Sequence, residues 1–292
     1  MTGALVPGGL PPVWLGAGAV TDPRALARFG PLLDVPVVVG PVQAGARRAR
    51  VGRTVVHGLG VGGLDHDDAR PVGPSAAEEL LAWAAARALT VCVALRGQTT
   101  GDLAAVLDRL RRHADADVVQ AVEVDLRLAD EQEVLRSMSR VREASPRGQR
   151  LLARLSVASP DLVGRARSAV AGGATAVVLA AQVPLGPGRW WSGPSTAALG
   201  LSGLRQLGEA ASEQRWPGAP LVLAGGVHSE ESARVAVREG AAAVQLGTGL
   251  WADPTLLWRV REAVLEELSA PTATPTSSAG RAPHTRTSRR EP

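Results

Sequence analysis

The stretch LAGGVHSEESARVAVREGAAAVQLGTG at residues 223–249 combines two apolar runs, two glycine turns and one helical segment. The first run ends in Gly225 and Gly226, and the second ends in Gly247 and Thr248. The segment between them has the spacing of an amphipathic helix that begins at a capping serine. Because neither run alternates with polar residues, we expect strands buried on both faces, as in a parallel sheet covered by helices.

The same alternation of strand and helix continues through most of the chain. About eight such units can be counted, the number that closes a (β/α)8 TIM barrel, and a doubly wound sheet is the alternative. We predict one barrel domain over residues 1–268 and a disordered tail rich in Pro, Ser, Thr and Arg at 269–292. The strands are expected at 13–18, 35–40, 89–95, 121–126, 150–157, 174–181, 220–226 and 241–249, and the helices at 75–88, 100–114, 129–144, 159–173, 195–214 and 229–240.

The two glycine turns predict an anion site. In a barrel, ligands bind at the carboxyl ends of the strands, and the last two strands commonly hold a phosphate there. Gly225, Gly226 and Gly247 would let the main chain approach a phosphate closely, and the Thr248 hydroxyl would add a donor. The alternative is that the glycines only form tight turns between strand and helix.

Composition excludes several classes of function. The chain has 292 residues and a net charge of +4, and its basic residues are all arginine, so Schiff-base chemistry on lysine is excluded. No arginine cluster is interleaved with aromatic residues, and we expect no nucleic-acid partner. A single cysteine, Cys92, fits a reducing cytoplasm. Without a signal-like segment or a long apolar run, we expect a cytoplasmic protein with no membrane contact.

Several segments resemble dihydroorotate dehydrogenases, the FMN-dependent barrels of pyrimidine biosynthesis. The most specific is PLVLAGGVHSEESARVAVREGAAAVQLGTGLWADP at the C-terminal end, and LGLSG at 199–203 is similar to the family's Gly-Leu-Ser-Gly segment. PVWLGAGAVTD is similar to the first strand, and AVEVDL to the strand before the catalytic or substrate loop. The likeness covers roughly residues 11–266.

The resemblance implies FMN as cofactor and the oxidation of dihydroorotate to orotate. It assigns the FMN phosphate to Gly225, Gly226, Gly247 and Thr248. It places further residues near the flavin, and these are Ala17, Gly18, Gly203 and Arg154, of which Arg154 stands at a family lysine position.

The chain departs from the family where protons are transferred and substrate is bound. The family position of the catalytic base matches Leu128, which cannot accept a proton, within the segment Arg127-Leu128-Ala129-Asp130. The family holds orotate with asparagines, and this chain has none. Asp125, Asp130 and Gln182 occupy the corresponding neighbourhoods, where a carboxylate would repel orotate. No catalytic residue is therefore identified from the sequence.

Three functions stay open. The first is an FMN-dependent oxidoreductase acting on a small molecule, with altered substrate and proton-transfer residues. The second is a barrel that binds FMN or only phosphate, without catalysis, and acts as a partner or sensor module. The third is a phosphate-binding aldolase or isomerase that uses no Schiff base.

Two other clusters draw attention. His66 lies among acids in LDHDD at 64–68, and we interpret this as an exposed polar turn rather than a metal site. Trp190 and Trp191 in GPGRWWSGPS are expected in an exposed loop over the barrel mouth. There they would stack on a ligand, form a lid, or make the contact of a homodimer.

Overall fold

The computed structural model describes residues 10–18, 22–46, 56–59 and 62–270. Its main sheet has eight parallel strands in the order β1-β12-β11-β8-β7-β6-β5-β2. A hydrogen bond of 3.1 Å from Leu15 N to Pro36 O brings the two end strands together, so the barrel is nearly closed. The strands are β1 (Val13–Leu15), β2 (Val37–Val42), β5 (Val91–Leu95), β6 (Val119–Asp125), β7 (Arg150–Ser156), β8 (Ala176–Ala180), β11 (Leu221–Ala224) and β12 (Ala243–Leu246).

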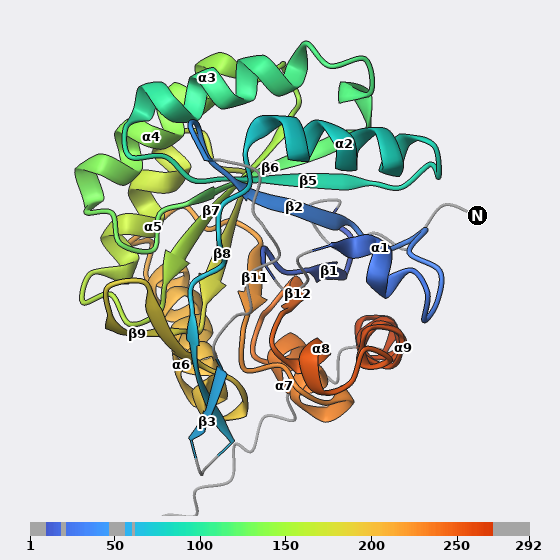
Figure 1. Ribbon diagram of the computed structural model, residues 1–292. Coiled ribbons are helices and arrows are strands. Elements are labelled where there is room, and N and C mark those ends of the chain that lie inside the picture. Colours follow the sequence, from blue (N-terminus) through green and yellow to red (C-terminus); the bar gives the residue numbers. More distant parts are fainter. Residues whose placement is uncertain (1–9, 19–21, 47–55, 60–61, 271–292) are drawn as a thin grey trace, which may run out of the picture.

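The helices lie around the outside of these strands (Figure 1). This arrangement is a (β/α)8 TIM barrel, as the sequence predicts. The α-helices are α1 (Pro23–Leu26), α2 (Pro74–Ala85), α3 (Thr100–Arg111), α4 (Glu131–Ala144), α5 (Leu162–Ala171), α6 (Ala197–Ser212), α7 (Glu230–Arg238), α8 (Gly249–Ala252) and α9 (Leu256–Ser269), and short 3-10 helices cover Ala116–Val118 and Pro194–Thr196.

Local sequence explains where several helices begin. The side chains of Thr99, Asp130 and Ser229 each accept a hydrogen bond from an amide in the first turn of α3, α4 and α7. Such caps satisfy amides that have no partner within the helix. Each cap follows a strand closely, so the chain leaves the barrel wall at a defined residue.

Two layers of apolar side chains stabilise the barrel. The larger layer, rich in Leu and Val, lies between the strands and the helices. The smaller one fills the barrel interior with Trp14, Leu152 and small residues such as Ala121. Cys92 belongs to this interior, and burial raises the pKa of its thiol well above the ordinary value. The thiol is therefore an unreactive packing group.

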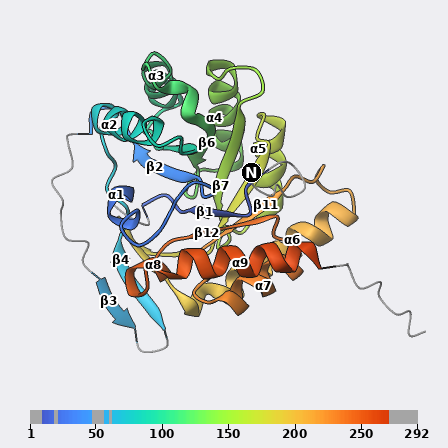
Figure 2. The same ribbon diagram turned by 90° about the vertical axis from the view of Figure 1, so that its right-hand side faces the viewer.

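A second sheet of four antiparallel strands has the order β3-β4-β10-β9. Figure 2 shows β3 and β4 at one end of the barrel, beside α8. Two connections build it, one between β2 and α2 and the other between β8 and α6. The strands are β3 (Val56–Leu59), β4 (Gly63–Asp67), β9 (Val183–Gly186) and β10 (Arg189–Ser192).

This sheet corrects two expectations. Trp190 and Trp191 lie in β10 rather than in an exposed loop, and Trp190 is 3% exposed. His66 lies in β4 opposite Trp190, and it is buried rather than in an exposed turn. Because β4 and β10 are distant in the chain, the pairing that buries these residues leaves no local signal in the sequence.

The sequence-based domain boundaries remain predictions. Helix α9 ends at Ser269, next to the predicted boundary at 268, and most of the predicted tail at 269–292 lies outside the described residues. Within the described ranges, no helix is both long and apolar enough to cross a membrane.

Candidate functional site

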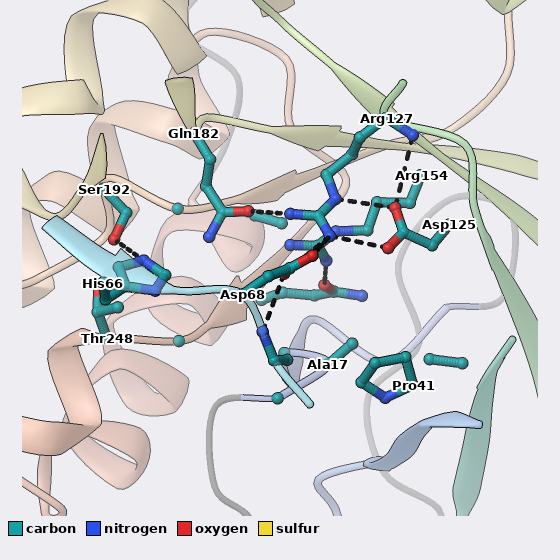
Figure 3. A pocket seen from close by; sticks show the side chains of 18 of the residues that line it. Ala17, Pro41, His66, Asp68, Asp125, Arg127, Arg154, Gln182, Ser192 and Thr248 are labelled. Carbon is teal, nitrogen blue, oxygen red and sulfur yellow. Dashed lines mark hydrogen bonds and ion pairs between the residues drawn. The ribbon is translucent and has the colours of Figure 1, made fainter. Parts of the chain in front are cut away.

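A cavity of about 70 Å³ lies at the carboxyl ends of the barrel strands, beneath the second sheet. Every barrel strand, or the loop that follows it, contributes to its wall (Figure 3). Two kinds of surface meet there. One is made mainly of small residues from β1, β2, β11 and β12, and the other of charged and amide side chains from β5 to β8.

The small residues form a surface that we call the shelf. It consists of Gly16, Ala17, Gly18, Pro41, Ala224, Gly225, Gly247 and Thr248. Ala69, in the segment after β4, covers part of the shelf. Its side chain is so close to Gly18 that a Cβ atom added to Gly18 would overlap with it. A flat ligand would find little steric hindrance from the shelf itself, but it would meet Ala69.

The end of the shelf offers main-chain donors. The amides of Gly247, Thr248 and Gly249 donate to no backbone carbonyl of the described residues. A Cβ atom added to Gly247 would meet nothing within 4 Å, so the space beside it is open. Amides that have no partner among the described residues, beside open space, can bind an anion such as phosphate.

The structure brings most of the predicted cofactor residues to this cavity. Ala17, Gly18, Arg154, Gly225, Gly247 and Thr248 all line it. Gly226 does not, because it faces the start of α6, where an added Cβ would lie 2.6 Å from the Cα atom of Ala197.

Gly203 does not line the cavity either. It lies within α6, where an added Cβ would come 2.9 Å from the Val157 side chain. The chain has a second Ser-Gly pair, Ser192-Gly193, directly before the start of the helical segment. Ser192 does line the cavity, so this pair, and not the one at Gly203, lies at the site.

Four charged side chains form a compact cluster on the opposite wall. Arg127 donates to Asp125 through Nε and Nη2, both at 2.8 Å, and to Asp68 at 3.1 Å. Arg96 Nη2 binds Asp125 at 2.7 Å and Asp68 at 3.1 Å. Arg127 Nη1 also donates to Gln182 Oε1 at 2.9 Å. Each arginine therefore contacts both carboxylates.

Burial makes this cluster electrostatically strong. Burial alone would raise the pKa of Asp125, but Arg127, followed by Arg96, holds that pKa far below its ordinary value. Burial would lower the pKa of Arg127, and the two carboxylates instead hold it above its usual range. The Arg127 guanidinium also stacks on Trp190, 4.2 Å from the ring centroid. Its position is thus fixed from several directions.

A second buried group lies deeper in the barrel. Arg154 Nη1 donates to Glu123 Oε1 at 3.2 Å and to Gln245 Oε1 at 3.0 Å. Gln245 Nε2 donates to Glu123 Oε2 at 2.6 Å. Arg154 lines the cavity and is 6% exposed, so a buried guanidinium stands at the position where the sequence comparison expects a cation.

His66 and Ser192 form a hydrogen-bonded pair that also lines the cavity. The imidazole Nδ1 lies 2.7 Å from the Asp67 carbonyl oxygen, which can only accept, so Nδ1 carries the proton. In the neutral ring, Nε2 then accepts from Ser192 Oγ at 2.8 Å. The His66 ring makes an edge-to-face contact with Trp251 of α8, and the two ring centroids lie 5.3 Å apart. The pair therefore lies beside the Thr248 end of the shelf.

The segment Arg127-Leu128-Ala129-Asp130 contributes one cavity residue. Leu128 is 76% exposed and lines a neighbouring depression instead of the cavity. Asp130 caps α4 through Glu133 N, so its carboxylate is used in the helix. Arg127 is the residue of this segment that reaches the cavity.

Sequence reasoning missed several cavity residues, namely Arg96, Asp68, Glu123, Gln245 and Ser192. Gln245 is the one polar residue of strand β12, and Glu123 lies between two valines in β6, so a polar residue flanked by apolar ones was a signal that could have found them. No comparable signal marks Arg96, and Asp68 was noted only as one of the acids of LDHDD, which we interpreted as an exposed turn. Among the described residues, no group of three or more His, Cys, Asp or Glu side chains could hold a metal ion.

Comparisons with known proteins support the fold. No family model matches the chain, and no curated protein matches it. A crystal structure of DHODH from Eimeria tenella in complex with ferulenol is similar, with a TM-score of 0.66, 14% identity and coverage of 87% of this chain and 80% of that chain. A ligand-free DHODH structure from the same organism gives a TM-score of 0.67, 14% identity and coverage of 88% and 84%. At this identity the likeness shows a shared barrel fold.

Proposed function

We propose that this barrel binds FMN at its mouth and acts as a flavin-dependent oxidoreductase on a small molecule. One observation carries the proposal: the shelf ends at amides that have no partner among the described residues, beside open space, and it shares the cavity with the buried guanidinium of Arg154. The similarity to DHODH structures supports a barrel of that type. When bound, FMN would supply hydride transfer.

The residues fit the phosphate of this cofactor better than they fit its ring. The amides at Gly247, Thr248 and Gly249 suit a phosphate group. The cavity of about 70 Å³ is well below the roughly 300–1,000 Å³ of usual ligand pockets. Ala69 narrows it over Gly18, so the ring would require the segment after β4 to move outward.

The other residues have defined parts in this proposal. Arg154, whose charge is balanced by Glu123, would offer N–H donors to an anionic ligand in the cavity. Ser192 and His66 would replace the missing base. A substrate proton would pass to Ser192 Oγ as the hydroxyl proton moves to His66 Nε2, and the positive charge would remain on the imidazole.

The decisive experiment is the absorbance spectrum of the purified protein, with titration of added FMN. We expect bound flavin that stays with the protein through gel filtration. Gly247→Val should weaken FMN binding at least about tenfold while leaving stability unchanged, because its side chain would enter the open space where phosphate binds.

Gly208→Val is the matched control for this experiment. Gly208 is exposed on α6, and a Cβ there also meets nothing within 4 Å, so this variant should bind FMN as the wild type does. A colourless protein that takes up no added FMN would refute the proposal.

A binding barrel without turnover is the second candidate. It is favoured by the charged cluster, in which Arg96, Arg127, Asp68 and Asp125 already neutralise one another. Anaerobic addition of dihydroorotate distinguishes the two candidates once flavin is bound. Bleaching of the flavin supports the oxidoreductase acting on dihydroorotate. If bleaching is absent with dihydroorotate and with other donors, the binding function remains.

A further inference from the structure

The carboxylate of Asp68 bridges the two arginines of the charged cluster from the solvent side. Its oxygens lie 3.1 Å from Nη2 of Arg96 and 3.1 Å from Nη2 of Arg127. We propose that this carboxylate stands in for that of a small-molecule ligand, which binds Arg96 and Arg127 after Asp68 has moved away. This inference deepens the proposed function, because the ligand would enter the same cavity.

Charge balance supports an anion at this position. Arg96 and Arg127 bring two positive charges, and Asp125 beneath them neutralises one. Asp68 neutralises the other. When Asp68 leaves, one uncompensated positive charge remains in a site that is largely shielded from water, and an anion would be bound strongly there.

The two guanidinium groups are fixed without Asp68. Arg127 keeps its bonds to Asp125 and Gln182 and its stacking on Trp190. Arg96 keeps two bonds to Asp125, at 3.0 and 2.7 Å. A pair of guanidinium groups already held in place suits the two oxygens of a carboxylate.

Asp68 is the member of the cluster best placed to leave. Its side chain is 23% exposed, whereas those of Arg127 and Asp125 are 6% and 10% exposed. Its release therefore costs less than breaking the more deeply buried pair of Arg127 and Asp125 beneath it. Ala69 follows Asp68 in the chain and would move with it, which would break the hydrogen bond of 3.1 Å from Arg96 Nη1 to the Ala69 carbonyl. The same movement would uncover the shelf at Gly18.

The class of ligand follows from the group that occupies the site. A carboxylate bridges both arginines, so we infer a small carboxylic acid whose remaining part lies over the shelf. Asp125 contributes to this site by neutralising excess charge and holding both arginines. A carboxylate is thus favoured even though the cavity contains acids.

Calorimetric titration with orotate and with uracil tests the proposal, since these probes share a ring and differ in the carboxylate. Asp68→Asn removes the competing charge, and we expect it to bind orotate at least about tenfold more tightly than the wild type does. Uracil affinity should not change. The double variant Asp68→Asn/Arg96→Gln should not show this tighter binding of orotate. Asp68→Ser is measured in parallel, so that poor folding of one variant does not prevent the test.

Glu133→Gln is the matched control. Glu133 is exposed and lines the depression next to the cluster, and it forms no ion pair with Arg96 or Arg127. Its replacement by Gln makes the same change in charge as Asp68→Asn does. It should leave orotate affinity unchanged. Equal gains for both variants, or no gain for either Asp68 variant, would overturn the proposal. Orotate binding is measured without reference to flavin absorbance, so failure here is distinguishable from failure to bind FMN.

Discussion

The two halves of the barrel mouth differ in the space and in the donor groups that they offer to a ligand. On the shelf, small residues leave space, and the available donors belong to the main chain. On the opposite wall, which we call the charged wall, the space is filled by the side chains of Arg96, Arg127, Asp68 and Asp125, which bind one another. The Gly247 end of the shelf is therefore open, whereas Ala69 covers its Gly18 end and the charged wall must first give up an internal partner. Under our proposals, a phosphate would need no rearrangement at Gly247, and a carboxylate would have to displace Asp68.

The charged wall should be the more fragile half. Arg127→Met removes the main partner of Asp125 and leaves a buried carboxylate with Arg96 alone. We expect a loss of about 3–5 kcal/mol in the free energy of unfolding, because an incompletely paired buried charge is strongly unfavourable. Urea unfolding followed by far-UV circular dichroism would measure it.

A surface arginine provides the comparison for this prediction. Arg140 pairs with Glu143 at 3.1 Å, and their side chains are 51% and 66% exposed, so Arg140→Met should cost only about 0–1 kcal/mol. Similar losses for the two variants would show that the cluster is not a strong stabilising element, and the contrast between the two halves would fail.

The glycines in and beside the shelf should respond to backbone changes instead. Gly226 has a φ of +74°, and an added Cβ would lie 2.6 Å from the Cα atom of Ala197. Gly226→Ala should therefore cost about 1–3 kcal/mol in the free energy of unfolding, as expected for a strained left-handed residue. Gly247→Ala adds a methyl group to open space and should cost less than about 0.5 kcal/mol.

Thermal and urea unfolding of both glycine variants would test this distinction. If Gly247→Ala were as destabilising as Gly226→Ala, the space beside Gly247 would be needed for packing, and the assignment of that space to phosphate would lose its support.

The same contrast explains what the sequence could predict. Apolar runs such as AVVLA at 176–180 mark buried strands locally, and the glycine turns mark the ends of two of them. The charged wall depends on side chains from separate elements, such as Arg127 and Asp68, which are 59 positions apart. No spacing rule links such residues before the fold is known. The second sheet was missed for a related reason, since its strands are short and its central pairing joins β4 to the distant β10.

The pH dependence of stability provides the finest test of the charged wall. The pKa of Asp125 is held far below its ordinary value of 3.8, mainly because Arg127 overcomes the effect of burial. A depressed pKa means that the unfolded chain takes up the proton first as pH falls. The stabilisation by this carboxylate is thus complete above the ordinary pKa and is lost progressively as the pH falls below it.

Between about pH 4 and about pH 3, this single group should remove about 1 kcal/mol from the free energy of unfolding. The Asp125→Asn variant has no carboxyl group at this position. Its free energy of unfolding should therefore fall by about 1 kcal/mol less than that of the wild type over the same pH interval, although the variant is less stable throughout. The other carboxylates titrate in both proteins, and their contribution cancels in the difference between the two slopes. Parallel pH profiles would mean that Asp125 is not held ionised by Arg96 and Arg127. The arginines would then lack the partner that fixes them for a ligand, and the wall would resemble an ordinary set of surface ion pairs.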